Sequence, residues 1–164
     1  SKTESRVSGL RKKLRRALGS SAVVTDPAAL AELAGDKWFA RGIPDVGVFP
    51  RSAEEVSRVM ALAAEFEAPV TTRGAGYGYV GGCVPSHGGV VLAMGGMTRI
   101  KEVSTADFVA VVEPGVITGD LQAAARRRRL FYPPDPASLR NCSIGGNIAT
   151  NAGGPRCLKY GVTR

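Results

Sequence analysis

A glycine-rich segment that directly follows a short β-branched stretch constrains the fold most. The segment "GAGYGYVGGCVPSHGG" occupies residues 74–89 and follows "APVTTR" at 68–73. Residues 68–73 are predicted to form a buried strand, because β-branched side chains favour an extended backbone. So many glycines, together with Pro85, cannot build a helix. The strand must therefore lead into an irregular loop.

The glycine spacing alone would fit a dinucleotide-binding turn of the Rossmann type. Gly76, Gly78 and Gly81 match its G-x-G-x-x-G pattern. Glu102 lies about 20 residues farther on, where an acidic side chain would hold a ribose. That turn requires a helix straight after the glycines, because the pyrophosphate rests on the helix N-terminus. Strands are predicted there instead, so a Rossmann site is excluded.

The segments before the loop predict helices and a small parallel unit. Residues 6–18 read as an amphipathic helix, and a second helix begins after Asp26, a good N-cap followed by proline. Residues 47–73 read as strand, helix and strand, in which Ser52 and Glu55 form a capping box. This pattern indicates a strand–helix–strand unit of parallel character.

The segments after the loop predict a different architecture. Residues 88–96, 99–104 and 108–115 are expected to be short strands of an antiparallel meander, because turns separate them at close spacing. We therefore expect an α+β fold. Residues 1–78 would form an N-terminal α/β subdomain with leading helices, and residues 79–164 the first part of a second, antiparallel subdomain.

The net charge of +8 raises the question of a nucleic-acid partner. Two runs carry much of it, "RKKLRR" at 11–16 and "RRRR" at 126–129. Leu10, Leu14 and Leu18 recur at helical spacing, which indicates an amphipathic helix with a solvated basic face. Arginines in a last helical turn complement the helix dipole. We expect no specific nucleic acid; the alternative function is a non-enzymatic nucleotide or nucleic-acid binding module that uses these basic helices.

The cysteines indicate a reducing compartment. Cys83, Cys142 and Cys157 are odd in number and show no CxxC spacing, so we expect free thiols in a cytoplasmic protein. His87 is the single histidine, and no metal site is expected. The apolar runs fall far short of the roughly 20 residues that a membrane span needs, so any association with a membrane would run through a partner.

A second glycine-rich segment, "IGGNIATNAGGP" at 144–155, points to a cofactor. Ser143 is predicted to cap a short helix whose first turn holds Gly145 and Gly146, which would leave N–H groups free to meet a phosphate or a flavin. In the first loop, glycines permit positive φ, so successive N–H groups can form an anion nest beside Arg73. Two such loops, about 70 residues apart, predict one site for an anionic cofactor.

Three longer strings resemble a known family, the FAD-binding domain of the vanillyl-alcohol-oxidase class (PCMH type). They are "PVTTRGAGYGYVGGCVP", "VVEPGV" and "FYPPDPASLRNCSIGGNIATNAGGPRCLKYGVT". They are most similar to the FAD-linked glycolate oxidase subunit and D-lactate dehydrogenase enzymes, from about Asp26 onward. The resemblance implies a fold of two subdomains with FAD between them. It also implies that the chain is incomplete at its C-terminus and that the catalytic residues lie beyond residue 164.

The resemblance further implies an FAD-dependent oxidoreductase. Its substrate would be a small 2-hydroxy acid such as D-lactate or glycolate, and its electrons would pass to a quinone, a cytochrome or oxygen. Residues 72–78 would wrap the pyrophosphate, the segment 134–138 would lie along the flavin and its linker, and the segment 143–153 would line the flavin or the adjoining phosphate. The implied cofactor-binding residues are Thr72, Arg73, Gly74, Ala75, Gly76, Tyr77, Gly78, Pro134, Asp135, Ser138, Ser143, Gly146, Asn147, Thr150, Asn151, Ala152 and Gly153.

Two residues depart from the family pattern and lead to a test. Ala75 stands where the family usually has glycine. Tyr77 stands where relatives have a small hydroxyl residue or a histidine bonded to the flavin, so covalent attachment at this position is excluded. We expect acid precipitation of the full-length protein to release all of the flavin colour into the supernatant. A yellow pellet would contradict non-covalent binding.

Overall fold

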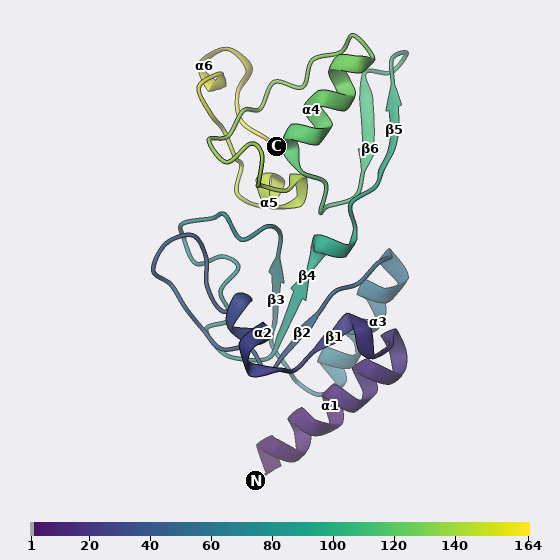
Figure 1. Cartoon of the computed structure of the whole chain (residues 1–164), viewed down its shortest axis with the longest axis vertical. Helices are drawn as coiled ribbons and strands as arrows, with labels where there is room; N and C mark the ends of the chain where they lie inside the picture. Colours follow the sequence, from purple (N-terminus) through teal and green to yellow (C-terminus); the bar gives the residue numbers. More distant parts are fainter. Residues whose placement is uncertain (1) are drawn as a thin grey trace. The chain divides into compact units, whose positions relative to one another are not determined.

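The computed structural model describes residues 2–164 and divides the chain into two compact units (Figure 1). The N-terminal unit runs to Arg73 and resumes over Gly78–Gly96. The C-terminal unit comprises Gly74–Tyr77 and Met97–Arg164. The predicted subdomain boundary between residues 78 and 79 stays a prediction.

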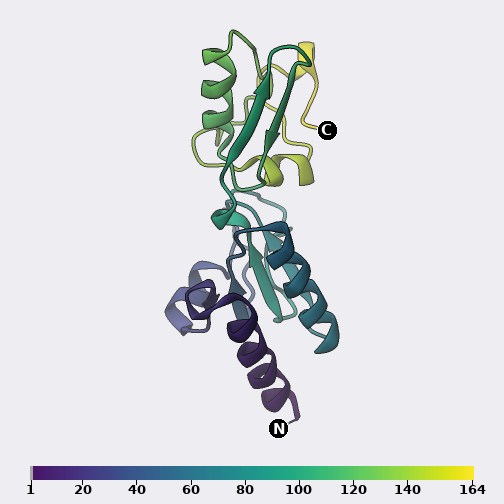
Figure 2. The ribbon, with the colours of Figure 1, turned by 90° about the vertical axis from the view of Figure 1, so that its right-hand side faces the viewer.

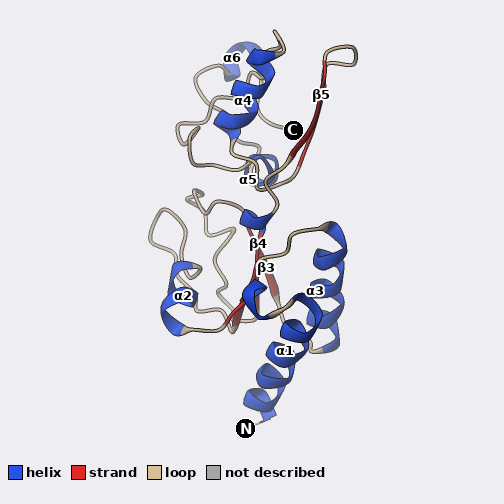
Figure 3. Ribbon diagram, turned by 45° about the vertical axis from the view of Figure 1, so that its right-hand side comes forward, coloured by secondary structure: helices blue, strands red, loops and turns tan. Residues whose placement is uncertain are grey.

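A four-stranded sheet forms the centre of the N-terminal unit (Figure 3). Its strands are β1 (Val23–Val24), β2 (Val46–Val48), β3 (Val70–Arg73) and β4 (Val90–Ala93). They lie in the order β1-β2-β4-β3. β4 pairs in parallel with both β2 and β3, whereas β1 pairs antiparallel with β2.

The position of β4 corrects the expectation that residues 88–96 begin an antiparallel meander. β4 is instead a central parallel strand of the N-terminal sheet. All four of its residues are buried, so both of its faces are covered. A continuous apolar run such as "VVLA" is typical of a parallel strand buried on both faces, whereas a meander strand alternates apolar and polar residues.

Helices pack against this sheet, and the two predicted N-caps, Asp26 and Ser52, are confirmed. The Asp26 carboxylate accepts the Ala29 N–H at 3.0 Å, and the Ser52 hydroxyl accepts the Glu55 N–H at 3.2 Å. The Glu55 carboxylate reaches the N–H of Arg51, one residue before the cap. The helical elements of the unit are α1 (Lys2–Leu18), η1 (Ser20–Ala22), α2 (Pro27–Glu32), α3 (Ala53–Glu65) and η2 (Met94–Gly96).

The leucine stripe of α1 enters the core, as its spacing predicts. Leu10 and Leu14 are 2% and 0% exposed, and they pack with Val59 of α3 and with β2 and β4. α1 and α3 therefore lie side by side, as Figure 2 shows.

Across residues 2–164, the structure contains no helix with both the length and the apolar character needed to span a bilayer.

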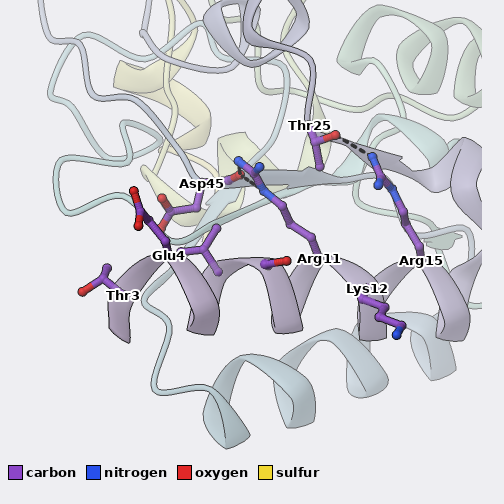
Figure 4. A pocket seen from close by; sticks show the side chains of 9 residues that line it. Thr3, Glu4, Arg11, Lys12, Arg15, Thr25 and Asp45 are labelled. Carbon is purple, nitrogen blue, oxygen red and sulfur yellow. Dashed lines mark hydrogen bonds between the residues drawn. The ribbon is translucent and has the colours of Figure 1, made fainter. Parts of the chain in front are cut away.

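The basic face of α1 is less free than the sequence indicates. Arg11 donates from Nε and from a terminal nitrogen to the Asp45 carbonyl oxygen, at 2.9 and 2.5 Å. Arg15 donates to the Thr25 hydroxyl at 2.5 Å. Both side chains line a pocket of about 640 Å³ beside the helix (Figure 4). The run at 126–129, by contrast, is exposed as expected.

The C-terminal unit contains the predicted antiparallel strands. β5 (Ile100–Ser104) and β6 (Val109–Val112) form a two-stranded hairpin. α4 (Thr118–Arg127) packs against this hairpin (Figure 2). Two short helices follow, α5 (Ile144–Ala149) and α6 (Cys157–Tyr160). The small core of the unit is built around Val116, Leu121 and Ile144.

A nearly buried carboxylate holds the open end of the hairpin. Glu113 is 3% exposed and accepts three bonds from Arg99, one from its backbone N–H at 2.8 Å and two from its guanidinium at 2.9 and 2.7 Å. The side-chain bonds from Arg99, followed by the backbone bond, hold the pKa of Glu113 below its ordinary value. The carboxylate therefore stabilises the fold above its unfolded pKa, and this stabilisation is lost as the pH falls through the lower folded value.

We expect Glu113→Gln to lower the thermal unfolding midpoint at neutral pH, because the charge-assisted bonds to Arg99 are lost. The deficit relative to the parent should shrink as the pH falls below about 4, the ordinary range of a glutamate. Unfolding midpoints recorded from neutral to acid pH in the full-length protein would measure both effects. Glu65→Gln is the control, because Glu65 forms an exposed ion pair with Lys13 and should change little. A deficit that stays constant with pH would refute the role of the Glu113 charge.

Candidate functional site

The two glycine loops meet within the C-terminal unit. The Ala75 N–H donates to the Ser143 hydroxyl oxygen at 3.2 Å, and Ser143 is buried. The approach is close enough that a Cβ on Gly74 would lie 2.6 Å from the Ser143 Oγ and 3.4 Å from the Gly146 nitrogen. Glycine at position 74 is therefore required by the contact with the second loop, and not only by the flexibility of the first.

The first loop offers backbone donors that the protein does not use. Gly76 has a φ of 77°, the left-handed region that favours glycine. Within residues 2–164, neither Gly76 nor Gly78 donates its N–H group to another residue. A side chain at Gly78 would meet no atom within 4 Å. Unpaired N–H groups on a left-handed turn are suited to phosphate oxygens, so this loop fits the pyrophosphate of a dinucleotide cofactor.

Arg73 has a structural role that the sequence did not indicate. Its guanidinium donates to the Gly35 carbonyl oxygen at 2.5 Å and lies 3.4 Å from the Cys83 sulfur. It thereby ties the end of β3 to the segment after α2. Thr72, one residue earlier, pairs with Leu92 in the sheet and is exposed. The contacts of Thr72 and Arg73 with a cofactor stay predictions.

The start of the second loop differs from its prediction. Ser143 takes the N-cap position of α5, but its hydroxyl makes no cap bond because it accepts from the first loop instead. The N–H groups of Ile144 and Gly145 donate to the segment 114–116, both at 2.8 Å. Of the first three N–H groups of α5, only that of Gly146 has no partner within residues 2–164. The second loop thus offers fewer free donors than its glycines suggest.

The Asn147 side chain is buried and faces α4. Its amide nitrogen donates to the Thr118 hydroxyl at 2.5 Å, and the two residues are 3% and 0% exposed. The sequence resemblance places Asn147 beside the flavin or the adjoining phosphate and does not single out Thr118. No local signal could have found Thr118, because its partner lies 29 residues away in the sequence.

The proline-rich segment is tied to its own unit by several contacts. The Pro134 carbonyl oxygen accepts from the Gln122 side chain at 2.8 Å. The Asp135 carboxylate lies 3.4 Å from a terminal nitrogen of Arg156. The Ser138 carbonyl oxygen accepts the N–H groups of residues 141 and 142. These contacts fix the backbone of the segment without using the Ser138 hydroxyl.

The end of the second loop is held mainly through its backbone. The Thr150 hydroxyl bonds back to a carbonyl oxygen of α5 at 2.9 Å. Asn151 is exposed and has a positive φ of 47°. The Ala152 N–H donates to the Asn147 carbonyl oxygen at 2.8 Å. A Cβ on Gly153 would collide with the Cys157 sulfur in α6.

Comparison with known proteins bears on this arrangement. The family model described as "FAD binding domain" matches residues 44–164. The glycolate oxidase subunit of Bacillus subtilis (strain 168) is 44% identical over 124 residues, which is 76% of this chain and 26% of the relative. A D-lactate dehydrogenase of Anaerostipes hadrus is 42% identical over 126 residues, 77% of this chain and 26% of the relative. The chain thus spans about a quarter of the length of these curated relatives.

Solved structures show the same fold. An alkyldihydroxyacetonephosphate synthase superimposes with a TM-score of 0.85 at 23% identity, covering 94% of this chain and 34% of the other. The 4-ethylphenol oxidase from Gulosibacter chungangensis superimposes with a TM-score of 0.78 at 27% identity, covering 90% of this chain and 29% of the other. The expected α+β fold of the PCMH type is thereby confirmed.

We expect Gly76→Val in the full-length protein to lower FAD affinity by at least about 100-fold, or roughly 2.7 kcal/mol. The side chain would penalise the positive φ and push a phosphate away from the unpaired N–H groups. The matched control is Gly95→Val, because Gly95 is exposed and a side chain there meets no atom within 4 Å. Quenching of flavin fluorescence measures both. Parent-like binding by a folded Gly76→Val protein would show that the loop is a structural turn.

Proposed function

The chain belongs to the FAD-binding-domain family, with FAD as its cofactor, and from this membership we propose that the full-length protein is an FAD-dependent oxidoreductase of the glycolate oxidase and D-lactate dehydrogenase kind. The observation that carries the proposal is the hydrogen bond from the Ala75 N–H to the Ser143 hydroxyl, which joins the two glycine loops. Next to this contact, the N–H group of Gly76 is unpaired within residues 2–164. A cofactor with a pyrophosphate is the ligand that such a donor suits.

Each segment of the site would have a distinct task. The unpaired N–H groups of the first loop, that of Gly76 among them, would hold the pyrophosphate, whose negative charge strengthens each hydrogen bond. Residues 134–138 and 143–153 would lie along the flavin. Their backbones are already fixed by contacts inside the C-terminal unit, so little ordering would accompany cofactor binding.

The proposed substrate is a small 2-hydroxy acid such as D-lactate or glycolate. Relatives of 42–44% identity carry the names glycolate oxidase subunit and D-lactate dehydrogenase, which supports this class. When bound, the flavin supplies a hydride acceptor for oxidation at the α-carbon of the acid. The hydroxyl group loses a proton in the same conversion, and the product is the 2-oxo acid. A quinone, a cytochrome or oxygen is the proposed final electron acceptor.

We expect D-lactate or glycolate to bleach the visible absorbance of the FAD-loaded, full-length protein in the absence of oxygen. Propionate is the control, because it lacks the hydroxyl group that must be oxidised. The measurement is the absorbance of the oxidised flavin before and after each addition. A flavin that dithionite bleaches and no 2-hydroxy acid bleaches would refute the proposed substrate class.

A further inference from the structure

A buried hydroxyl at the start of α4 makes contacts that the proposed cofactor site does not yet explain. Thr118 is 0% exposed, and its hydroxyl contacts Cys142, just before the second glycine loop, and Asn147 within it. It donates to the Cys142 carbonyl oxygen at 3.3 Å and accepts from the Asn147 amide at 2.5 Å. The Cys142 thiol is a third, weaker partner at 3.4 Å.

These contacts use the full capacity of the hydroxyl. A threonine hydroxyl has one proton to donate and two lone pairs to accept with. Here the proton goes to Cys142 and the lone pairs face the Asn147 amide and the Cys142 thiol. The Thr118 N–H also donates to the Cys142 carbonyl oxygen, at 3.0 Å. The Thr118 hydroxyl is therefore fully used by Cys142 and Asn147 and has no capacity left for any other ligand.

The second glycine loop must be stabilised by contacts with the rest of its unit. α5 has only six residues, and a helix of that length is not stable by itself in water. Two of the six are glycines, which lose the most backbone freedom on ordering. The buried side chain of Asn147 is consequently an important tether, because it fixes the middle of α5 to α4.

The tether acts on both ends of the loop. The Asn147 N–H donates to the Ser143 carbonyl oxygen at 2.9 Å, and the Ser143 hydroxyl in turn accepts the Ala75 N–H. In the other direction, the Asn147 carbonyl oxygen accepts the Ala152 N–H at 2.8 Å. A single buried residue pair thus connects the first loop, the start of α5 and the end of the second loop.

From this geometry we infer that Thr118 is a positioning residue of the FAD site. It acts through Asn147 and keeps Ser143 where its hydroxyl can receive the first loop. The inference rests on the proposed function, because it assigns the two joined loops to one cofactor. Thr118 itself does not touch the cofactor.

Thr118→Val tests the inference, because valine keeps the shape of threonine and removes the hydroxyl. The variant leaves the buried Asn147 amide without its acceptor. In the full-length protein, the FAD dissociation constant should rise about tenfold. Thr118→Ser restores a hydroxyl and should bring the constant back to within about twofold of the parent. A purely volumetric role predicts the reverse order, since serine lacks the buried methyl group.

A second measurement does not depend on the cofactor. In the apoprotein, Thr118→Val should speed hydrogen exchange at the Ala75 and Ala152 amides, because both depend on the tethered loop. The amide of Ala63 in α3 should exchange as in the parent. Asn147→Leu removes the same hydrogen bond from its other end, and the double variant should lose no more affinity than the weaker-binding single variant.

Val59→Thr is the matched control. It places a hydroxyl in the buried core of the N-terminal unit, so it should lower the unfolding midpoint and leave the FAD dissociation constant unchanged.

Parent-like FAD affinity and parent-like exchange in Thr118→Val would overturn the inference and leave the proposed function standing. If Thr118→Val does not fold, parent-like affinity in Asn147→Leu overturns it. A parent that binds no FAD would refute the proposed function, and the exchange rates would still decide whether Thr118 holds the loop.

Discussion

The hydrogen bond from the Ala75 N–H to the Ser143 hydroxyl joins loops that lie 68 residues apart in the sequence. It forms only because Gly74 has no side chain in the way and because Ser143 is held in a buried position. The segment 114–116 holds the start of α5, and the Thr118–Asn147 pair holds its middle. The arrangement of the two loops therefore depends on the packing of the whole C-terminal unit as well as on glycine at position 74.

The local features of the fold were predictable where a pattern repeats within one segment. The leucine spacing of α1 and the cap at Ser52 depend on neighbouring residues, and both are confirmed. The antiparallel pairing of β5 with β6 is also confirmed. It was predictable because only a short turn separates the two strands. The expectation for β4 was wrong because its partners, β2 and β3, precede the glycine-rich loop, whereas β5 follows β4 more closely in the sequence. Close spacing along the chain indicates pairing only when no distant partner competes.

The candidate site divides in the same way. The glycine positions could be found from the sequence, because both the close approach of two backbones and a positive φ favour glycine over other residues. The actual contacts of Arg73, Ser143 and Asn147 could not be found from the sequence, because each of these polar side chains could bond several partners of the same chemistry. Arg73 bonds a carbonyl oxygen, and the Ser143 hydroxyl accepts from another loop instead of capping its own helix. Only the fold decides between such partners.

The order of strands in the N-terminal sheet has a consequence for synthesis of the chain. β2 and β3 do not pair with each other, and both find their parallel partner in β4, which ends at Ala93. On the ribosome, neither strand can enter the parallel ladder until that residue has emerged. Pairing between segments distant in sequence is intrinsically slow. Until then, β2 and β3 of the nascent chain expose unpaired strand edges, and this interval is when a chaperone would have most to protect.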